Sequence, residues 1–70
     1  MSQQLVQSVL ATAEQEFEIR PGRIVLQSRA VMEQGKRFLV RVFVDVDREP
    51  AEVITAYRTS KISKYWKEKL

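Results

Sequence analysis

The sequence predicts an α+β fold of the order α-β-β-β-α, a three-stranded antiparallel meander between an N-terminal helix and a short C-terminal helix. Residues 38–46 are apolar at every even position and rich in β-branched and aromatic side chains, which is typical of an interior strand. The stretches at both ends of the chain place apolar residues at helical spacing. Residues 1–70 fit a single domain.

Residues 2–17 are predicted to form the first helix. Ser2 is a suitable N-cap, and Pro21 and Gly22 break the helical pattern. The residues of its apolar stripe are spaced by one, three or four: Leu5, Val6, Val9, Leu10, Ala13 and Phe17.

Two further strands flank the apolar run. Residues 23–32 alternate between a more apolar and a less apolar face, and residues 33–36 form a tight turn in which Gly35 can adopt a positive φ. Residues 47–50 are a polar turn ending in proline, and residues 51–59 favour the third strand.

Residues 61–69 are predicted to form the last helix, capped by Thr59 or Ser60. Its apolar face comprises Ile62, Tyr65, Trp66 and Leu70. Its other side carries lysines spaced by three: Lys61, Lys64 and Lys67.

The two predicted turns set Arg41 opposite Ser28 and Ala56, with Arg58 one diagonal away on the same face. Two guanidinium groups beside small side chains leave room for a phosphate or a carboxylate, which a guanidinium can hold bidentately. A slip of one residue in either hairpin would separate the pair.

The other face of the predicted sheet is the more apolar one, so the first helix is predicted to pack on it. It comprises Val25, Val31, Phe38, Val40, Val42, Val44, Val53, Thr55 and Tyr57. A purely structural role for Arg41 is the alternative to the anion site, because structural ion pairs are common. Its partner would then be Asp45, Glu52 or a glutamate of a second chain.

Length and composition restrict the function classes. A chain of 70 residues buries only roughly 60% of the surface that it exposes when unfolded, so self-association, most simply a homodimer, is expected. The sequence contains no cysteine and no histidine, which removes disulfides, thiolate sites and the commonest general base; no metal and no cofactor are expected. No apolar stretch approaches roughly 18 residues, so no membrane contact and a cytoplasmic location are expected.

Charge is distributed unevenly along the chain, whose net charge is +3. Up to Ile19 the only charged side chains are the acids Glu14, Glu16 and Glu18. From Arg58 onward, cations outnumber Glu68, the one acid: Arg58, Lys61, Lys64, Lys67 and Lys69. A basic end suits an anionic partner such as RNA, DNA or an acidic protein, although a solvated helix face would look the same.

Residues 57–66 combine hydroxyls, cations and aromatic rings where a strand meets a helix. Such a segment can bind phosphates and stack on bases of RNA. Tyr65 and Trp66 also lie at helical spacing from Ile62, so packing in the core or in a dimer is the alternative. The candidate residues for binding an anion or RNA are therefore Arg41, Tyr57, Arg58, Lys61, Lys64 and Tyr65.

The two stretches 41–45 (Arg-Val-Phe-Val-Asp) and 53–66 (Val-Ile-Thr-Ala-Tyr-Arg-Thr-Ser-Lys-Ile-Ser-Lys-Tyr-Trp), with Pro50 between them, resemble the C-terminal half of an uncharacterised family. It consists of small bacterial, notably cyanobacterial, proteins and is known as domain of unknown function 4258. The resemblance covers roughly residues 19–66, and the ending from Tyr57 to Trp66 is its most specific part.

This resemblance implies a compact sheet similar to those of the RelE-like and barnase-like ribonuclease toxins. In such toxins, basic residues and a tyrosine hold RNA and stabilise the transition state of cleavage. Longer family members open with a helical segment bearing a histidine and an arginine; this chain has no histidine, and its first basic residue is Arg20.

Three hypotheses for the function follow. The first is a non-catalytic binding module of toxin–antitoxin-like type that contacts RNA or a partner protein through its basic C-terminal surface. The second is a RelE-like ribonuclease in which Arg41 and Arg58 neutralise the scissile phosphate while a lysine or Tyr65 transfers protons. The third is a self-associating structural domain without a ligand.

Overall fold

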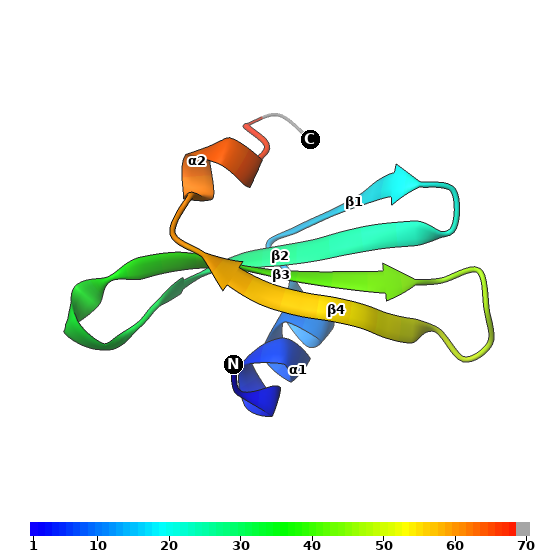
Figure 1. Ribbon diagram of the computed structural model, residues 1–70, viewed down its shortest axis with the longest axis horizontal. Coiled ribbons are helices and arrows are strands. Elements are labelled where there is room, and N and C mark those ends of the chain that lie inside the picture. Colours follow the sequence, from blue (N-terminus) through cyan, green and yellow to red (C-terminus); the bar gives the residue numbers. More distant parts are fainter. Residues whose placement is uncertain (69–70) are drawn as a thin grey trace.

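The computed structural model describes residues 1–68, apart from the side chain of Glu33, and confirms an α+β architecture. One four-stranded antiparallel sheet, of order β1-β2-β3-β4, lies between two helices (Figure 1). The elements are α1 (Gln3–Thr12), β1 (Gln15–Arg20), β2 (Arg23–Val31), the 3₁₀ turn η1 (Glu33–Gly35), β3 (Arg37–Asp45), β4 (Glu52–Thr59) and α2 (Ile62–Tyr65). The prediction of three strands is wrong, because it missed β1.

Helix α1 begins where the sequence predicts but ends earlier. The side chain of Ser2 accepts a hydrogen bond from the backbone N–H of Leu5, as an N-cap does. The helix ends at Thr12, and the six residues of β1 then alternate between the two faces of the sheet. Phe17 lies at helical spacing from Ala13 yet belongs to β1, where it pairs with Val25. The period of two in β1 therefore overrides the continued helical stripe.

The β2–β3 hairpin sets a register that differs by one residue from the predicted one. Val31 pairs with Arg37, so the β2–β3 connection spans residues 32–36 and is longer than the expected tight turn. Arg41 consequently lies opposite Gln27 and not opposite Ser28. Next to the second turn, Asp45 pairs with Glu52, as the predicted register requires. An irregularity between Phe43 and Val44 then shifts the β3–β4 pairing by one residue, so Arg41 lies opposite Tyr57 and not opposite Ala56.

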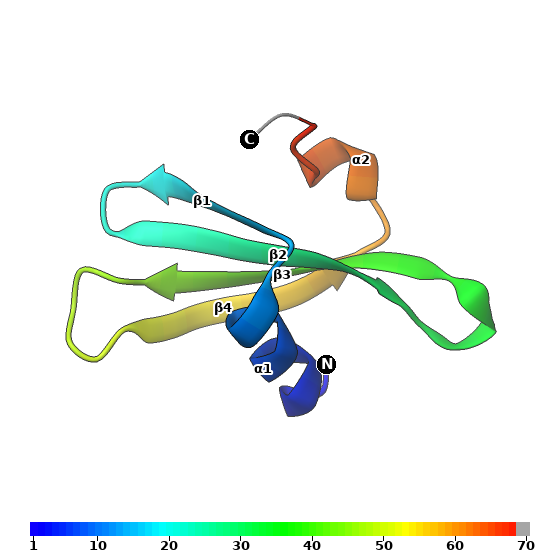
Figure 2. The ribbon, with the colours of Figure 1, turned by 180° about the vertical axis from the view of Figure 1, so that it is seen from behind.

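One face of the sheet, here called the α1 face, carries the main apolar core. Helix α1 packs on it and lies in front of the strands when the molecule is seen from behind (Figure 2). The buried residues of this core are Val9, Leu26, Val40, Val42 and Val44. The prediction for this face is right for the central strand, but β2 contributes Ile24 and Leu26 instead of Val25. Strand β4 contributes Ala56, and the predicted Tyr57 lies on the opposite face.

The opposite face, here called the α2 face, is half polar. Val25 and Leu39 are completely buried on it, beside Gln27 and Arg41. Helix α2 is a single turn that ends at Tyr65, so it is shorter than the predicted helix. The end of that prediction, residues 69–70, lies outside the described part of the chain. Within residues 1–68, no helix has the length and the apolar content needed to cross a membrane.

Candidate functional site

Arg41 lies at the centre of β3 and is almost completely buried, with 8% of its surface exposed. Its Nε donates a hydrogen bond to Gln27 Oε1 at 2.9 Å, and its Nη1 donates to the hydroxyl oxygen of Tyr57 at 2.8 Å. Both acceptors are neutral. The cross-strand pairs Gln27–Arg41 and Arg41–Tyr57 bring these three side chains together on the α2 face.

Aromatic rings surround the guanidinium of Arg41. Its central carbon lies 4.3 Å from the ring centroid of Tyr65, 5.1 Å from that of Phe43 and 5.9 Å from that of Tyr57. The rings of Phe43 and Tyr57 are themselves stacked, with centroids 6.1 Å apart. Electron-rich ring faces stabilise a cation that has lost much of its water, which explains why the α2 face tolerates a buried arginine.

No carboxylate of the described residues lies within ion-pair distance of Arg41. Asp45 pairs instead with Arg23 and Arg48, and Glu52 pairs with Arg48. The alternative that Arg41 is neutralised by Asp45 or Glu52 is therefore wrong. The hydrogen bonds from Arg23 hold the pKa of Asp45 below its usual value. This carboxylate is therefore bound to Arg23 and not to Arg41.

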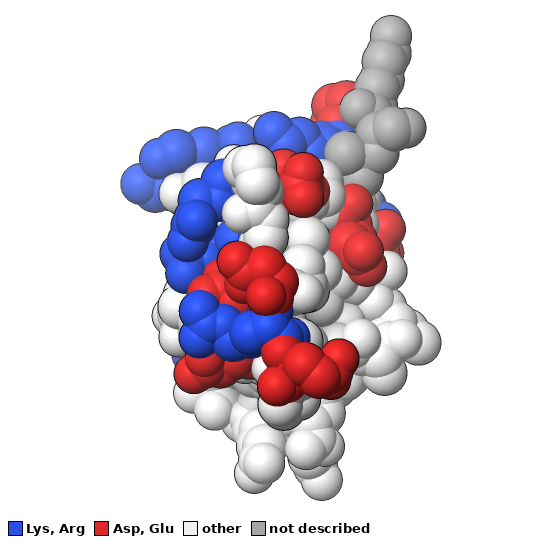
Figure 3. All heavy atoms as spheres, turned by 90° about the vertical axis from the view of Figure 1, so that its right-hand side faces the viewer, with Lys and Arg blue, Asp and Glu red and all other residues white. Residues whose placement is uncertain are grey.

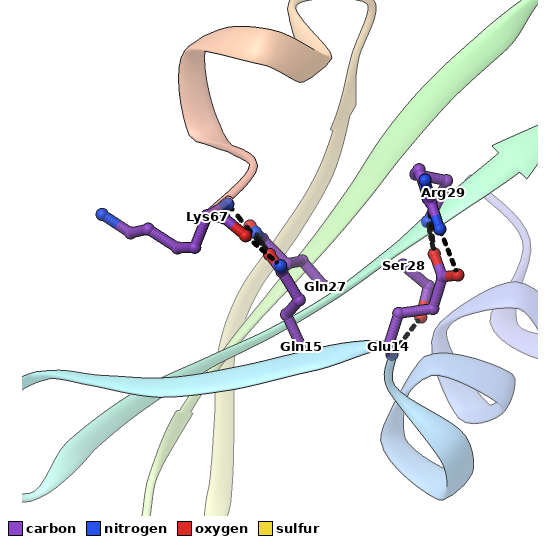
Figure 4. Close-up of polar contacts among 6 residues, drawn as sticks. All are labelled: Glu14, Gln15, Gln27, Ser28, Arg29 and Lys67. Atoms are coloured by element: carbon purple, nitrogen blue, oxygen red, sulfur yellow. Dashed lines mark hydrogen bonds and ion pairs between the residues drawn. The ribbon is translucent and has the colours of Figure 1, made fainter. Parts of the chain in front are cut away.

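Two buried glutamines connect Arg41 to the C-terminal segment. Gln27 Nε2 donates to Gln15 Oε1 at 2.7 Å and to the backbone carbonyl oxygen of Tyr65 at 3.1 Å. Gln15 Nε2 donates to the carbonyl oxygen of Lys67 at 2.6 Å, and the Lys67 N–H donates back to Gln15 Oε1 at 3.1 Å (Figure 4). These bonds attach α2 and the residues after it to the sheet.

The sequence did not reveal either glutamine as part of the site. Gln15 falls within the predicted first helix, and Gln27 looks like an ordinary polar position of an alternating strand. The structure leaves Gln27 completely buried and Gln15 8% exposed. Their importance depends on the pairing of β1 with β2, which places them opposite each other.

Basic side chains continue from this cluster over the α2 face. The Lys64 Nζ lies 5.2 Å from the Tyr65 ring centroid, and the Lys67 Nζ lies 5.1 Å from that of Phe17. Lys61 is exposed at the start of the turn. None of the three lysines forms an ion pair with another residue in the described part of the chain.

Trp66 packs against Arg29, whose guanidinium carbon lies 4.1 Å from its ring centroid. The same guanidinium pairs with Glu14 (Figure 4). The hydrogen bond from the Arg29 side chain lowers the pKa of Glu14. These contacts favour the packing role of Trp66 over a role in stacking on bases.

Acidic side chains lie on both faces of the sheet, and Asp45 pairs with Arg23 on the α2 face. Glu16 and Glu18 pair with Leu26 and Ile24, whose side chains belong to the α1 face. At the end of the molecule with the β1–β2 and β3–β4 loops, acidic and basic side chains lie intermixed (Figure 3). Basic side chains follow the upper margin of that view, the side on which α2 lies.

Arg58 lies on the α1 face, because it pairs with Val40 and follows Tyr57 in the alternation of β4. Its guanidinium carbon is 5.0 Å from the ring centroid of Phe38. The predicted anion pocket made jointly by Arg41 and Arg58 is therefore wrong. Among the predicted binding residues, the structure brings Arg41, Tyr57 and Tyr65 together.

Comparison of the chain with protein-family models, with curated proteins and with solved structures finds no match. The resemblance to domain of unknown function 4258 and to ribonuclease toxins stays a prediction.

Proposed function

We propose that this protein is a non-catalytic module that binds RNA through its α2 face. The observation that carries the proposal is the guanidinium of Arg41, which is buried among neutral acceptors and aromatic rings without a carboxylate partner among the side chains that the structure describes. A desolvated cation without a counter-charge is costly, and an incoming anion relieves that cost. A phosphate group is the anion best matched to the fork of an arginine.

The donors around Arg41 support phosphate as the ligand. A guanidinium carries five N–H groups, and described residues accept from its Nε and Nη1. The hydroxyl oxygen of Tyr57 accepts from Arg41, so its own hydrogen is available to a second acceptor. A phosphate oxygen beside these two side chains would receive hydrogen bonds from both.

The lysines extend this site into a surface for a polyanion. Residues 61–67, here called the α2 segment, carry three lysines. Lys61, Lys64 and Lys67 can neutralise successive phosphates of an RNA strand that follows this segment. The Tyr65 ring contacts the guanidinium of Arg41 and lies near Lys64, so it connects the buried cation to the lysines. A flexible single strand of RNA can follow this row of cations.

The geometry favours binding over cleavage. In the ribonuclease hypothesis Arg41 and Arg58 neutralise one scissile phosphate, but their side chains lie on opposite faces of the sheet. A phosphate on the α2 face can therefore reach only one of the two arginines. The acid–base groups of that hypothesis would then act without the second cation.

The test measures binding of a fluorescent oligouridylate by anisotropy over a range of salt concentrations. We expect the Lys64→Gln/Lys67→Gln double variant to bind more weakly and to reduce the slope of log K against log salt by about 1.4, or about 0.7 for each lost phosphate contact. The matched control is Arg20→Gln/Lys36→Gln, which removes the same charge from exposed positions outside the α2 segment.

The proposal fails if the parent protein does not bind at low salt, or if both double variants lose the same slope. Gel analysis of the incubated RNA distinguishes binding from cleavage, and we expect the RNA to remain intact. Size-exclusion chromatography of the free protein tests self-association separately. A dimer that does not bind RNA would support the structural-domain hypothesis instead.

A further inference from the structure

A pocket on the α1 face is not used by the proposed RNA surface. It has a volume of about 400 Å³ and is lined by Met32, Gln34, Phe38 and Arg58. This size lies within the range of roughly 300–1,000 Å³ that is typical of small-molecule sites. The pocket lies at the β2–β3 hairpin, where β4 ends beside β3.

Arg58 presents two different surfaces at this pocket. Its guanidinium lies over the Phe38 ring, 5.0 Å from the centroid, so the ring supports one side of the cation. The opposite side of a planar guanidinium can stack on a second flat group, while its N–H edge can hold an anion. Arg58 has no ion-pair partner among the residues that the structure describes.

The turn supplies the remaining walls of the pocket. Gln34 has a positive φ of 67°, a conformation that is rare for residues other than glycine, and Gly35 follows with a φ of 75°. A strained backbone conformation at a binding surface is consistent with a functional role. The amide of Gln34 can donate and accept hydrogen bonds, and the thioether of Met32 gives an apolar wall.

We infer that this pocket holds one nucleotide. Its base would stack on the outer plane of Arg58, its phosphate would take the N–H edge of the same guanidinium, and Gln34 would contact the polar edge of the base. The nucleotide can be a free monophosphate or one residue of an RNA strand. Both sources present the same chemistry, a flat heterocycle next to a phosphate.

The position of β4 connects the pocket with the α2 face. Tyr57 and Arg58 are consecutive residues of this edge strand, so their side chains project to opposite faces. A strand of RNA bound on the α2 face could pass around the edge at β4 and place its next nucleotide in the pocket. In this form the inference rests on the proposed function, whereas binding of a free nucleotide does not.

The experiment follows the backbone amides of Gln34, Phe38 and Arg58 by NMR during titration with adenosine monophosphate, with adenosine, with inorganic phosphate and with a short oligoadenylate. We expect adenosine monophosphate to shift these amides and to bind more tightly than either of its parts. Arg58→Ala should reduce its affinity by about tenfold or more, because a charge-assisted contact and a stacking surface are lost.

Two further variants separate binding from folding. Arg37→Ala also removes one positive charge next to Phe38, but the side chain of Arg37 lies on the α2 face. The affinity for adenosine monophosphate should therefore not change. Gln34→Gly relieves the left-handed backbone without weakening the hairpin and removes the amide. We expect this variant to bind adenosine monophosphate more weakly while it unfolds at the same or a higher temperature.

Each outcome assigns the source or overturns the inference. Shifts of these amides with adenosine monophosphate indicate a site for a free nucleotide. Shifts with oligoadenylate alone, lost in Lys64→Gln/Lys67→Gln, indicate one residue of a bound strand. The inference is overturned if neither probe shifts these amides, if phosphate alone binds as well as the nucleotide, or if Arg37→Ala and Arg58→Ala have equal effects. RNA binding on the α2 face would stand in each of those cases.

Discussion

Replacement of Gln27 by leucine tests the buried polar cluster most directly. Gln27 is completely buried and makes three hydrogen bonds: it donates to Gln15 and to the Tyr65 carbonyl oxygen, and it accepts from Arg41. Leucine fills the space but has no polar atom. Gln15 Oε1 keeps its bond from the Lys67 N–H, so two groups lose their described partner: Arg41 Nε and the Tyr65 carbonyl oxygen.

The expected cost follows from these two groups. Each buried polar group left without a partner costs about 1–3 kcal/mol, and the charged one lies toward the upper end. The sum of about 2–6 kcal/mol is reduced by about 1–2 kcal/mol through the more favourable burial of leucine, which leaves roughly 1–4 kcal/mol. A domain of 70 residues has a free energy of unfolding of about 4–10 kcal/mol, so the loss takes a large share of the total.

The assay is urea unfolding followed by the fluorescence of Trp66, the one tryptophan, and by far-ultraviolet circular dichroism. With a slope of about 1 kcal/mol per molar urea, the midpoint should fall by roughly 1–4 M. Because the lost bonds hold α2 to the sheet, the fluorescence change should also begin at lower urea than the change in circular dichroism. The control is Gln27→Leu/Arg41→Met, which also removes the orphaned cation and should recover part of the stability.

Two results would refute this reasoning. One is a free energy of unfolding for Gln27→Leu within about 0.5 kcal/mol of the parent value, which is the range of an ordinary surface substitution. The other is a double variant that is less stable than Gln27→Leu, because removal of both partners should relieve the unpaired charge. Either result would show that the cluster around Arg41 is hydrated and not buried as the structure has it.

The remaining predictions concern charge and backbone. The pKa of Asp45 is lowered by its hydrogen bonds with Arg23. The contribution of this ion pair to stability should therefore be fully present above the ordinary carboxyl pKa, and it should be lost as the pH falls through the lowered pKa. Asp45→Asn should remove that part of the acid dependence of thermal unfolding; an unchanged pH profile would contradict the ion pair. Gly35→Ala should destabilise the fold by about 1–2 kcal/mol, because its φ is +75° and only backbone strain is added. Gly22→Ala should cost more in chemical unfolding, since its new Cβ would also lie 2.5 Å from the Asp47 Oδ2; equal losses would show that Asp47 moves away freely.

Local sequence patterns predicted the three longest strands closely. Strand β3 was expected at residues 38–46 and is found at Arg37–Asp45, because alternation and β-branched side chains are properties of the stretch itself. The start of α1 was predicted for the same kind of reason, since its cap at Ser2 is a local interaction. Strand β1 was missed, because its short alternating pattern overlaps with an apparent continuation of the helical stripe and forms a strand by pairing with β2.

The sequence by itself therefore determined the α+β class, three of the four strands, the amphipathic helix and the basic C-terminal segment. Only the tertiary structure decided which side chains share a face. The β2–β3 connection is longer than the predicted tight turn, and the β3–β4 ladder has an irregularity between Phe43 and Val44. Each of them shifts the pairing by one residue, and such a shift exchanges the faces on which paired side chains lie. For that reason Arg41 lies beside Gln27 and Tyr57, whereas Arg58 lies on the opposite face.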